Sequence, residues 1–184
     1  PNNFKWFILA RGSDPLFVLD SGPDVDDTSD DRFRSFNASN SELPNNDVLS
    51  VAADLNGDVW VGTTDGVVTF DCGGAVFEPS ICQGSRRIVT IDGIPALLLE
   101  TESVTAIAVD GANRKWFGTN NGVFVQSADG TEQLNHFTTD NSPLPSNIIQ
   151  SLTIDQQSGE VFIGTNEGIV SYLGEAVEGG VVNN

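Results

Sequence analysis

One pattern recurs in register along this chain and constrains its fold more than any other feature. Each copy has an aspartate, an aromatic residue, a Gly-Thr pair and a further glycine, and the copies are 56 residues apart from Gly62 to Gly118 and 46 apart from Gly118 to Gly164. The full copies are NDVLSVAADLNGDVWVGTTDGVVTFD, TESVTAIAVDGANRKWFGTNNGVFVQS and SNIIQSLTIDQQSGEVFIGTNEGIVSYLG. Equivalent positions are Asp54, Asp110 and Asp155; Trp60, Trp116 and Phe162; Gly62, Gly118 and Gly164; Gly66, Gly122 and Gly168. A degraded copy opens the chain, in which Trp6 and Gly12 keep the spacing of Trp116 and Gly122.

Each copy reads as a group of short antiparallel strands. The stretch 114–127 alternates apolar and polar residues around Asn120-Asn121-Gly122, which is typical of a β-hairpin with positive backbone angles in an Asn-Gly turn. A longer loop then leads to a fourth strand, for which the candidates are Phe33–Phe36, Arg87–Ile91 and Leu134–Thr138. A repeated four-stranded unit predicts a β-propeller blade. A single β-sandwich is the alternative, but it would not explain the in-register aromatic and glycine positions.

We therefore predict an all-β fold: a β-propeller segment of four-stranded antiparallel blades that forms an incomplete ring. Small inner strands such as Ser50–Asp54 should line the channel, and the repeated aromatic residues should pack as wedges between neighbouring blades. The repeated glycines should allow backbones to approach closely. The expected units are residues 1–42, a partial blade with an acidic loop and the following outer strand; 43–101, a blade; 102–143, a blade; and 144–184, the last blade with a C-terminal extension.

The charge balance narrows the partners that the chain can bind. Eight basic and 26 acidic residues give a formal net charge of −18, so a nucleic acid or an anionic membrane surface would be repelled. No apolar run approaches the ~20 residues of a membrane helix, so we expect no membrane insertion. Neutral or cationic partners, metal ions and glycans remain open. The chain begins with Pro1 and has no methionine, which favours an excised piece of a longer protein.

The blade pattern resembles the two-component-regulator propeller repeat, of the form LPxNxI…D…G…WxGT…G. That repeat occurs in extracytoplasmic sensor domains and in secreted proteins of Bacteroidetes-type bacteria. The stretches LLLETESVTAIAVDGANRKWFGTNNGVFVQSADG and SPLPSNIIQSLTIDQQSGEVFIGTNEGIVSYLGEAVEGG, with DDTSDDRF upstream, are most similar to the second propeller of PorZ-like proteins of the type IX secretion system. The resemblance covers almost the whole chain.

The resemblance implies a cell-surface protein, located at the outer-membrane surface or in the periplasm. Its implied partners are PorU, PorQ and PorV in an attachment complex, together with an anionic lipopolysaccharide that anchors secreted cargo. Such a family member has two propellers and a C-terminal sorting domain. The resemblance assigns no ligand-binding residue in this sequence.

An acidic loop is the one candidate metal site in the sequence. Six carboxylates crowd the stretch DSGPDVDDTSDDR and offer the hard oxygen ligands that Ca²⁺ prefers, although their spacing is not that of an EF-hand. The alternative is a solvated acidic loop between blades. The residues are Asp20, Asp24, Asp26, Asp27, Asp30 and Asp31.

The other reactive or charged residues give weaker signals. Cys72 and Cys82 flank a short loop and predict a disulfide in an extracytoplasmic protein. His136 is the single histidine, so no nucleophilic triad can be built, and we predict a surface or linker role. Arg114-Lys115 offers cations for a glycan phosphate or carboxylate, or else forms a solvated strand edge.

The predicted function is non-catalytic: a surface scaffold or glycan-binding module in type IX protein secretion. One alternative is the ligand-sensing propeller of a hybrid two-component regulator, and another is a propeller enzyme that acts on glycans. We expect no cofactor other than calcium. The open faces of the end blades should pair with other blades of the parent propeller or with a second copy in a homodimer.

Overall fold

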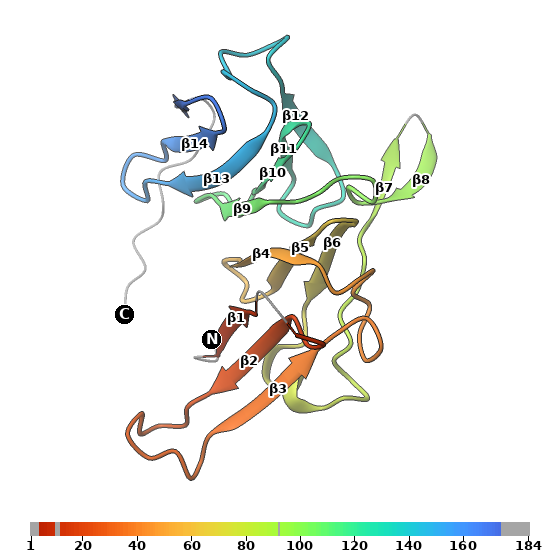
Figure 1. Cartoon of the computed structure of the whole chain (residues 1–184), viewed down its shortest axis with the longest axis vertical. Helices are drawn as coiled ribbons and strands as arrows, with labels where there is room; N and C mark the ends of the chain where they lie inside the picture. Colours follow the sequence, from red (N-terminus) through yellow and green to blue (C-terminus); the bar gives the residue numbers. More distant parts are fainter. Residues whose placement is uncertain (1–3, 10–11, 92, 174–184) are drawn as a thin grey trace.

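The computed structural model describes residues 4–9, 12–91 and 93–173. Within them, fifteen strands form antiparallel sheets that stand around an arc as four blades plus one extra hairpin (Figure 1). The first blade has three strands: β1 (Lys5–Ile8), β2 (Leu16–Asp20) and β3 (Arg32–Phe36). The second also has three: β4 (Val48–Ala53), β5 (Val59–Thr63) and β6 (Gly66–Phe70). The third has four, namely β9 (Ala106–Val109), β10 (Lys115–Thr119), β11 (Gly122–Gln126) and β12 (Gln133–Phe137), and the fourth has β13 (Ile149–Ile154), β14 (Val161–Thr165) and β15 (Ile169–Tyr172). The extra hairpin joins β7 (Ile88–Ile91) to β8 (Ile94–Leu97).

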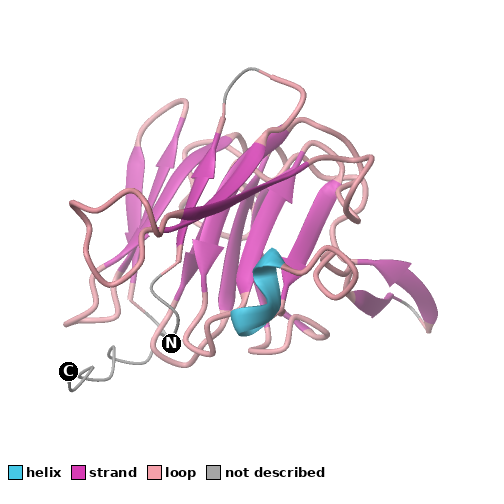
Figure 2. Cartoon of the chain, turned by 90° about the horizontal axis from the view of Figure 1, so that it is seen from below, coloured by secondary structure: helices cyan, strands magenta, loops and turns pink. Residues whose placement is uncertain are grey.

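The blades stand face to face around the arc. Figure 2 shows their strands side by side, with the short 3₁₀ helix η1 (Gly73–Phe77) outside the sheets. The inner strands β4, β9 and β13 neighbour one another in that order. The all-β propeller segment predicted from the repeats is therefore confirmed. In the described part of the chain, no helix is long and apolar enough to cross a membrane.

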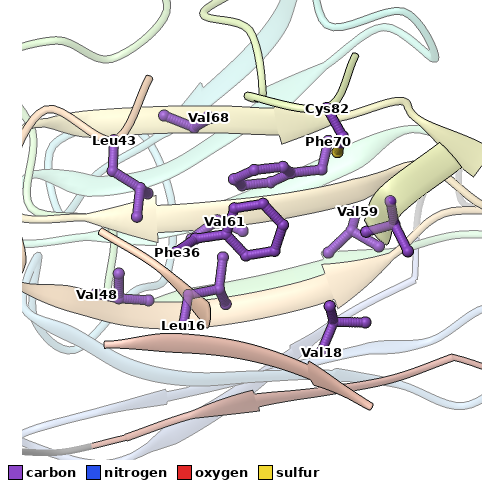
Figure 3. Close-up of a cluster of buried hydrophobic side chains, with 11 residues drawn as sticks. Leu16, Val18, Phe36, Leu43, Val48, Val59, Val61, Val68, Phe70 and Cys82 are labelled. Atoms are coloured by element: carbon purple, nitrogen blue, oxygen red, sulfur yellow. The ribbon is translucent and has the colours of Figure 1, made fainter. Parts of the chain in front are cut away.

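The hydrophobic core lies between the blades rather than inside any one of them. A first cluster joins Leu16, Val18 and Phe36 of the first blade to Val61 and Phe70 of the second, and Figure 3 shows these side chains meeting between the sheets. A second cluster joins the second and third blades, and a third joins the third and fourth. Because each sheet is apolar on both faces, a blade buries its surface only when it has a neighbour on each side.

The repeated aromatic residue packs as a wedge between two blades wherever another described blade follows its own. Trp60 is 1% exposed and packs against Phe117 of the third blade, with ring centroids 6.0 Å apart. Trp116 is equally buried, in the cluster that joins the third and fourth blades. Phe162 has the same place in the repeat but is 38% exposed, because no described blade follows the fourth.

The repeated glycines permit close approach, as the sequence predicted. A Cβ on Gly62 would lie 2.6 Å from the carbonyl oxygen of Val104 in the third blade. A Cβ on Gly118 would lie 2.5 Å from Cγ2 of Ile149 in the fourth. Glycine at these positions therefore sets the distance between blades.

The predicted hairpin turn is in the right place, but its backbone differs from the expectation. Thr119 pairs with Gly122, which leaves Asn120-Asn121 as the loop. Neither asparagine has a positive φ; Gly122 alone takes one, at 104°. The Thr119 hydroxyl explains the difference, since it accepts a hydrogen bond from the Asn121 N–H at 2.9 Å and so supports an ordinary turn.

Two of the three predicted fourth strands are confirmed and one is wrong. Phe33–Phe36 lies in β3 and pairs with β2, and Leu134–Thr138 overlaps β12, which pairs with β11. Arg87–Ile91 instead overlaps β7, which pairs with β8 in the separate hairpin. A single bridge between Thr69 and Ser85 takes the place of an outer strand on the second blade, because the disulfide loop and η1 occupy the intervening chain.

Candidate functional site

An open groove runs along the outer edge of the first blade, between β3 and the loop that contains η1. We call it the rim groove; its volume is about 850 Å³. It brings two arginines, three phenylalanines and two side-chain amides together. Its lining residues are Phe17, Asp31, Arg32, Phe33, Arg34, Ser35, Asn40, Phe77, Pro79 and Gln83.

The disulfide loop forms one wall of the rim groove. Cys72 and Cys82 are joined with an S–S distance of 2.01 Å and a Cα–Cα distance of 5.4 Å. The backbone N–H of Glu42 donates to the carbonyl oxygen of Gln83 at 2.8 Å, which fixes the far end of the loop against the first linker. The disulfide therefore closes the loop on itself, and the hydrogen bond beside Cys82 attaches the closed loop to the first linker.

Arg34 attaches this wall to the first blade. Its Nη1 donates to the carbonyl oxygen of Val76 in η1 at 2.7 Å, and its guanidinium lies 4.3 Å from the ring centroid of Phe36. Burial lowers the pKa of Arg34, but an arginine stays charged at neutral pH. Arg34 thus gives the groove a fixed positive charge that also has a structural role.

Arg32 is the more accessible cation, with 60% of its side chain exposed. Its Nη2 lies 2.6 Å from Oδ2 of Asp20, and its guanidinium lies 4.6 Å from the ring centroid of Phe77. The hydrogen bond from Arg32 lowers the pKa of Asp20. Because an exposed ion pair is worth little, Arg32 can release Asp20 at small cost to engage a ligand.

A row of three neighbouring phenylalanine rings crosses the first blade and ends in the groove. Phe33 is 70% exposed and stacks on Phe17, with centroids 5.7 Å apart and planes at 23°. Phe7 continues the row at 6.3 Å from Phe17. Exposed aromatic faces beside fixed hydrogen-bonding groups suit a ligand with one apolar and one polar face.

Asp31 adds an acceptor that the protein itself does not use. Its Oδ1 is buried and has no hydrogen-bond partner within the described residues. A buried acceptor without a donor is costly unless a ligand or water supplies one. The groove therefore offers guanidinium donors and a free carboxylate acceptor, a combination that matches the hydroxyl groups of a polyol.

The six predicted calcium ligands are not gathered around one point. Asp20 pairs with Arg32, and the side chains of Asp24 and Asp27 accept hydrogen bonds from the backbone N–H groups of Asp26 and Ser29. Across the described residues, no group of three or more His, Cys, Asp or Glu side chains is placed to hold a metal ion. Calcium binding by Asp20, Asp24, Asp26, Asp27, Asp30 and Asp31 stays a prediction.

Neither interpretation of Arg114-Lys115 agrees with the structure. Lys115 is completely buried, with its Nζ 2.8 Å from Oδ2 of Asp54. The Nε of Arg114 lies 2.6 Å from Oδ2 of Asp110, and the Arg114 side chain is 13% exposed. The pair is thus neither a ligand-facing cation pair nor a solvated strand edge, because each residue neutralises a buried aspartate.

His136 belongs to the outer strand β12 rather than to a linker. Its ring stacks on Phe124 with centroids 3.8 Å apart, and its Nε2 lies 2.8 Å from the carbonyl oxygen of Asn121. These contacts give the side chain a packing role at the edge of the third blade.

Sequence reasoning missed the arginines and aromatics of the rim groove. The outer strand of the first blade reads RFRSF, whereas the equivalent strand of the third blade reads QLNHF. The replacement of Gln133 and Asn135 by Arg32 and Arg34 was visible in the repeat. It gives the outer strand of the first blade two positive charges that the outer strand of the third blade lacks.

No protein-family model matches the sequence, and no curated protein matches it either. Among solved structures, the chain is similar to PorZ, an essential surface component of the type IX secretion system of Porphyromonas gingivalis. The two share 28% identity over 94% of this chain, with a TM-score of 0.81. The chain spans a quarter of the length of that PorZ chain, at 25%.

Two further structures show the same fold at lower identity. The extracellular domain of BT3049 from B. thetaiotaomicron, assigned to a hybrid two-component system, matches 94% of this chain and 20% of its own at 22% identity, with a TM-score of 0.65. An ancestral GH74 enzyme matches 88% of this chain and 20% of its own at 18% identity, with a TM-score of 0.55. The chain is therefore a β-propeller segment, and its likeness to PorZ and to a two-component extracellular domain confirms the family resemblance that its repeats indicated.

Proposed function

We propose that this chain is a non-catalytic, glycan-binding propeller module of a cell-surface protein that acts in type IX secretion and cargo attachment. The observation that carries the proposal is the likeness to PorZ, at 28% identity over nearly the whole chain. The BT3049 domain and the GH74 enzyme share less than 25% identity with the chain. Their likeness therefore supports the fold but not a sensing or catalytic function.

An extracytoplasmic location is part of the proposal. PorZ is a surface component, and the BT3049 structure is an extracellular domain. The disulfide between Cys72 and Cys82 agrees with an oxidising compartment. By the same likeness we include PorU, PorQ and PorV as partners and an anionic lipopolysaccharide as the glycan.

The rim groove is where we place the glycan. The apolar face of a sugar ring would lie on Phe33, while its hydroxyl or acidic groups would meet Arg32 and Asp31. The chain's net charge of −18 opposes an anionic polymer at long range, so binding depends on the local arginines and should weaken little with added salt.

The test is calorimetric titration of the full chain with the purified polysaccharide part of lipopolysaccharide. One titration uses a neutral form and the other an acidic form. Phe33→Ala and Arg32→Gln should each weaken binding by about tenfold, a loss typical of an interface anchor. Leu134→Ala is the matched control, because Leu134 holds the place of Phe33 in the third blade and is 40% exposed. It should bind as the unchanged chain does.

Three results would contradict this assignment. If neither polysaccharide produced heat, the glycan-binding proposal would be wrong. If the Phe33 and Leu134 variants lost equal affinity, the rim groove would not be the binding site. Release of reducing sugar ends during the titration would show catalysis and exclude a purely binding role.

A further inference from the structure

The hairpin of β7 and β8 stands away from the blades. Figures 1 and 2 both show it projecting from the arc, and among the described residues its two strands pair with each other and with no further strand. Its base is packed, since Val89 is 8% exposed and joins, with Ala96, the cluster between the second and third blades. A two-stranded hairpin is marginally stable in water, so the projecting part would gain from a third strand.

The hairpin is apolar on both faces. Residues opposite each other in the pairing share a face, so Val89 and Ala96 lie on the packed face and Ile88 and Leu97 on the other. Ile88 is 63% exposed, and Ile94, which follows the packed face outward beyond Ala96, is 67% exposed. Strands that are apolar on both faces are typical of the buried interior of a larger sheet. This hairpin has that composition but lies at the surface.

The two outer edges of the hairpin differ in what they offer to another strand. The N–H of Leu98 donates to the carbonyl oxygen of Arg87 at 2.8 Å. Because bonded and non-bonded pairs alternate along an antiparallel ladder, the N–H and C=O groups of Ile88 and Thr90 face away from β8. Pro95 lies opposite Thr90 and has no N–H, which interrupts the outer edge of β8. The outer edge of β7 is therefore the one with a complete set of donors and acceptors.

A positive charge lies at the beginning of β7, in a chain whose net charge is −18. The Nη2 of Arg86 donates to the carbonyl oxygen of Asp65 at 3.1 Å, and its Nε is buried without a hydrogen-bond partner in the described part of the chain. No carboxylate among the described residues forms an ion pair with Arg86, whereas Nη2 of Arg87 lies 3.6 Å from Oδ2 of Asp71. A strand that ran antiparallel to β7 would have its carboxyl end beside Arg86, so an acidic residue is favoured there.

We propose that the outer edge of β7 binds an extended segment of another protein, rich in β-branched residues and with an acidic residue at its carboxyl end. The segment adds a third strand to the hairpin. Its backbone exchanges hydrogen bonds with Ile88 and Thr90, its side chains cover the exposed face, and its carboxylate meets Arg86. A second copy of the chain is a poorer occupant, because two molecules that each carry a net charge of −18 repel each other.

The probe is the synthetic peptide acetyl-SVTIVD-amide, titrated calorimetrically into the full chain. In antiparallel register its aspartate lies opposite Arg86 and its isoleucine opposite Ile88. A second peptide, acetyl-SVTIVN-amide, lacks the charge. We expect the first peptide to bind and the second to bind about tenfold more weakly, a loss typical of a hydrogen bond to a charged group. In the variant Arg86→Gln the two peptides should bind equally.

A variant of the edge itself tests the backbone contact. Thr90→Pro removes an N–H that faces away from β8 and leaves the bonds between β7 and β8 in place, so it should weaken peptide binding at least tenfold. Thr90→Val is the matched control, because it keeps the N–H, and it should bind as the unchanged chain does. Circular dichroism checks that both variants fold.

Amide hydrogen exchange on the unchanged chain locates the peptide without relying on any variant. The N–H groups of Ile88 and Thr90 should gain protection when the peptide binds. No binding, equal affinity of the two peptides, binding without that protection, or full binding to a folded Thr90→Pro variant would each overturn the proposal. Protection of the same amides without peptide, rising with protein concentration, would show that a second copy occupies the edge and would also overturn it.

Discussion

The Nζ of Lys115 lies 2.8 Å from Oδ2 of Asp54, and at most 1% of either side chain is exposed. Asp54 follows the inner strand of the second blade, and Lys115 begins β10 of the third, so this ion pair joins two blades. Lys115 also donates to the carbonyl oxygen of Asn113 at 2.8 Å and lies 4.9 Å from the ring centroid of Trp60. The ammonium group also donates to the carbonyl oxygen of Ala128, so protein groups accept all three of its N–H donors.

Removing one partner of this pair should be far more damaging than removing both. Lys115→Met should lower the free energy of unfolding by about 3–5 kcal/mol, because it leaves the Asp54 carboxylate buried without its counter-charge. The double variant Asp54→Asn, Lys115→Met should recover most of that loss. Urea unfolding of the variants measures both effects, and a double variant no more stable than Lys115→Met would show that the charge pairing is unimportant.

This ion pair could not be predicted from the sequence, although much of the fold could. The repeat located the inner strands, the aromatic wedges and the close-approach glycines, because each recurs at a fixed spacing. Among the three full copies Lys115 is alone, because its equivalents are Val59 and Val161, although the degraded copy has Lys5 at the same place. Its partner lies in another blade, so neither its burial nor its pairing follows from local pattern.

The candidate site was harder to predict than the fold for a related reason. The rim groove exists because a disulfide loop with η1 follows the second blade where an outer strand was expected. Its arginines were present in the sequence, but which surface they face depends on how that irregular loop packs. The acidic loop was predicted to bind calcium from its composition alone. Composition does not show whether the carboxylates point toward one metal ion.

Asp58 should oppose folding at neutral pH. Burial raises its pKa, and the negative charges of Asp54 and Asp71 raise it further. A folded-state pKa above the unfolded value means that the folded chain holds the proton more tightly, so stability falls as pH rises through that window. Asp58→Asn should therefore raise the free energy of unfolding at pH 7, and the gain should vanish below about pH 3.5. Unfolding curves at both pH values test this, and an equal gain at both would assign the effect to something other than charge.

Gly62 should tolerate a methyl group less well than its equivalent in the last blade. In Gly62→Ala the new Cβ would meet a backbone oxygen of the next blade, which cannot move aside, and we expect a loss of about 1–3 kcal/mol. In Gly164→Ala the three nearest atoms to the new Cβ belong to Ser151, whose hydroxyl, 2.4 Å away, can rotate. Thermal melts of the two variants should differ in that order, and the reverse order would remove the interblade explanation.

Reduction of the disulfide should weaken both the fold and the rim groove. The bond spans ten residues, and closing a loop of that size contributes about 2–3 kcal/mol. The paired variant Cys72→Ser, Cys82→Ser should unfold at lower urea and bind glycan less well, because the loop that carries Phe77 is released. Intact-mass measurement before and after alkylation reports the native bond, and two free thiols in periplasmic material would contradict it.

The exposed faces of the end blades should make the chain associate. Phe162 and Ile169 lie on the open face of the fourth blade, 38% and 78% exposed, and Phe33 of the first blade is 70% exposed. Internal blades bury the equivalent faces, so these surfaces are shaped to receive a neighbour, and apolar patches of this kind drive association. Light scattering should show a dimer or larger species at high micromolar concentration. Phe162→Ser with Ile169→Ser should shift it toward monomer, whereas Leu55→Ser, at a 61% exposed turn away from the blade faces, should not. A stable monomer of the unchanged chain would mean that the open faces need no partner.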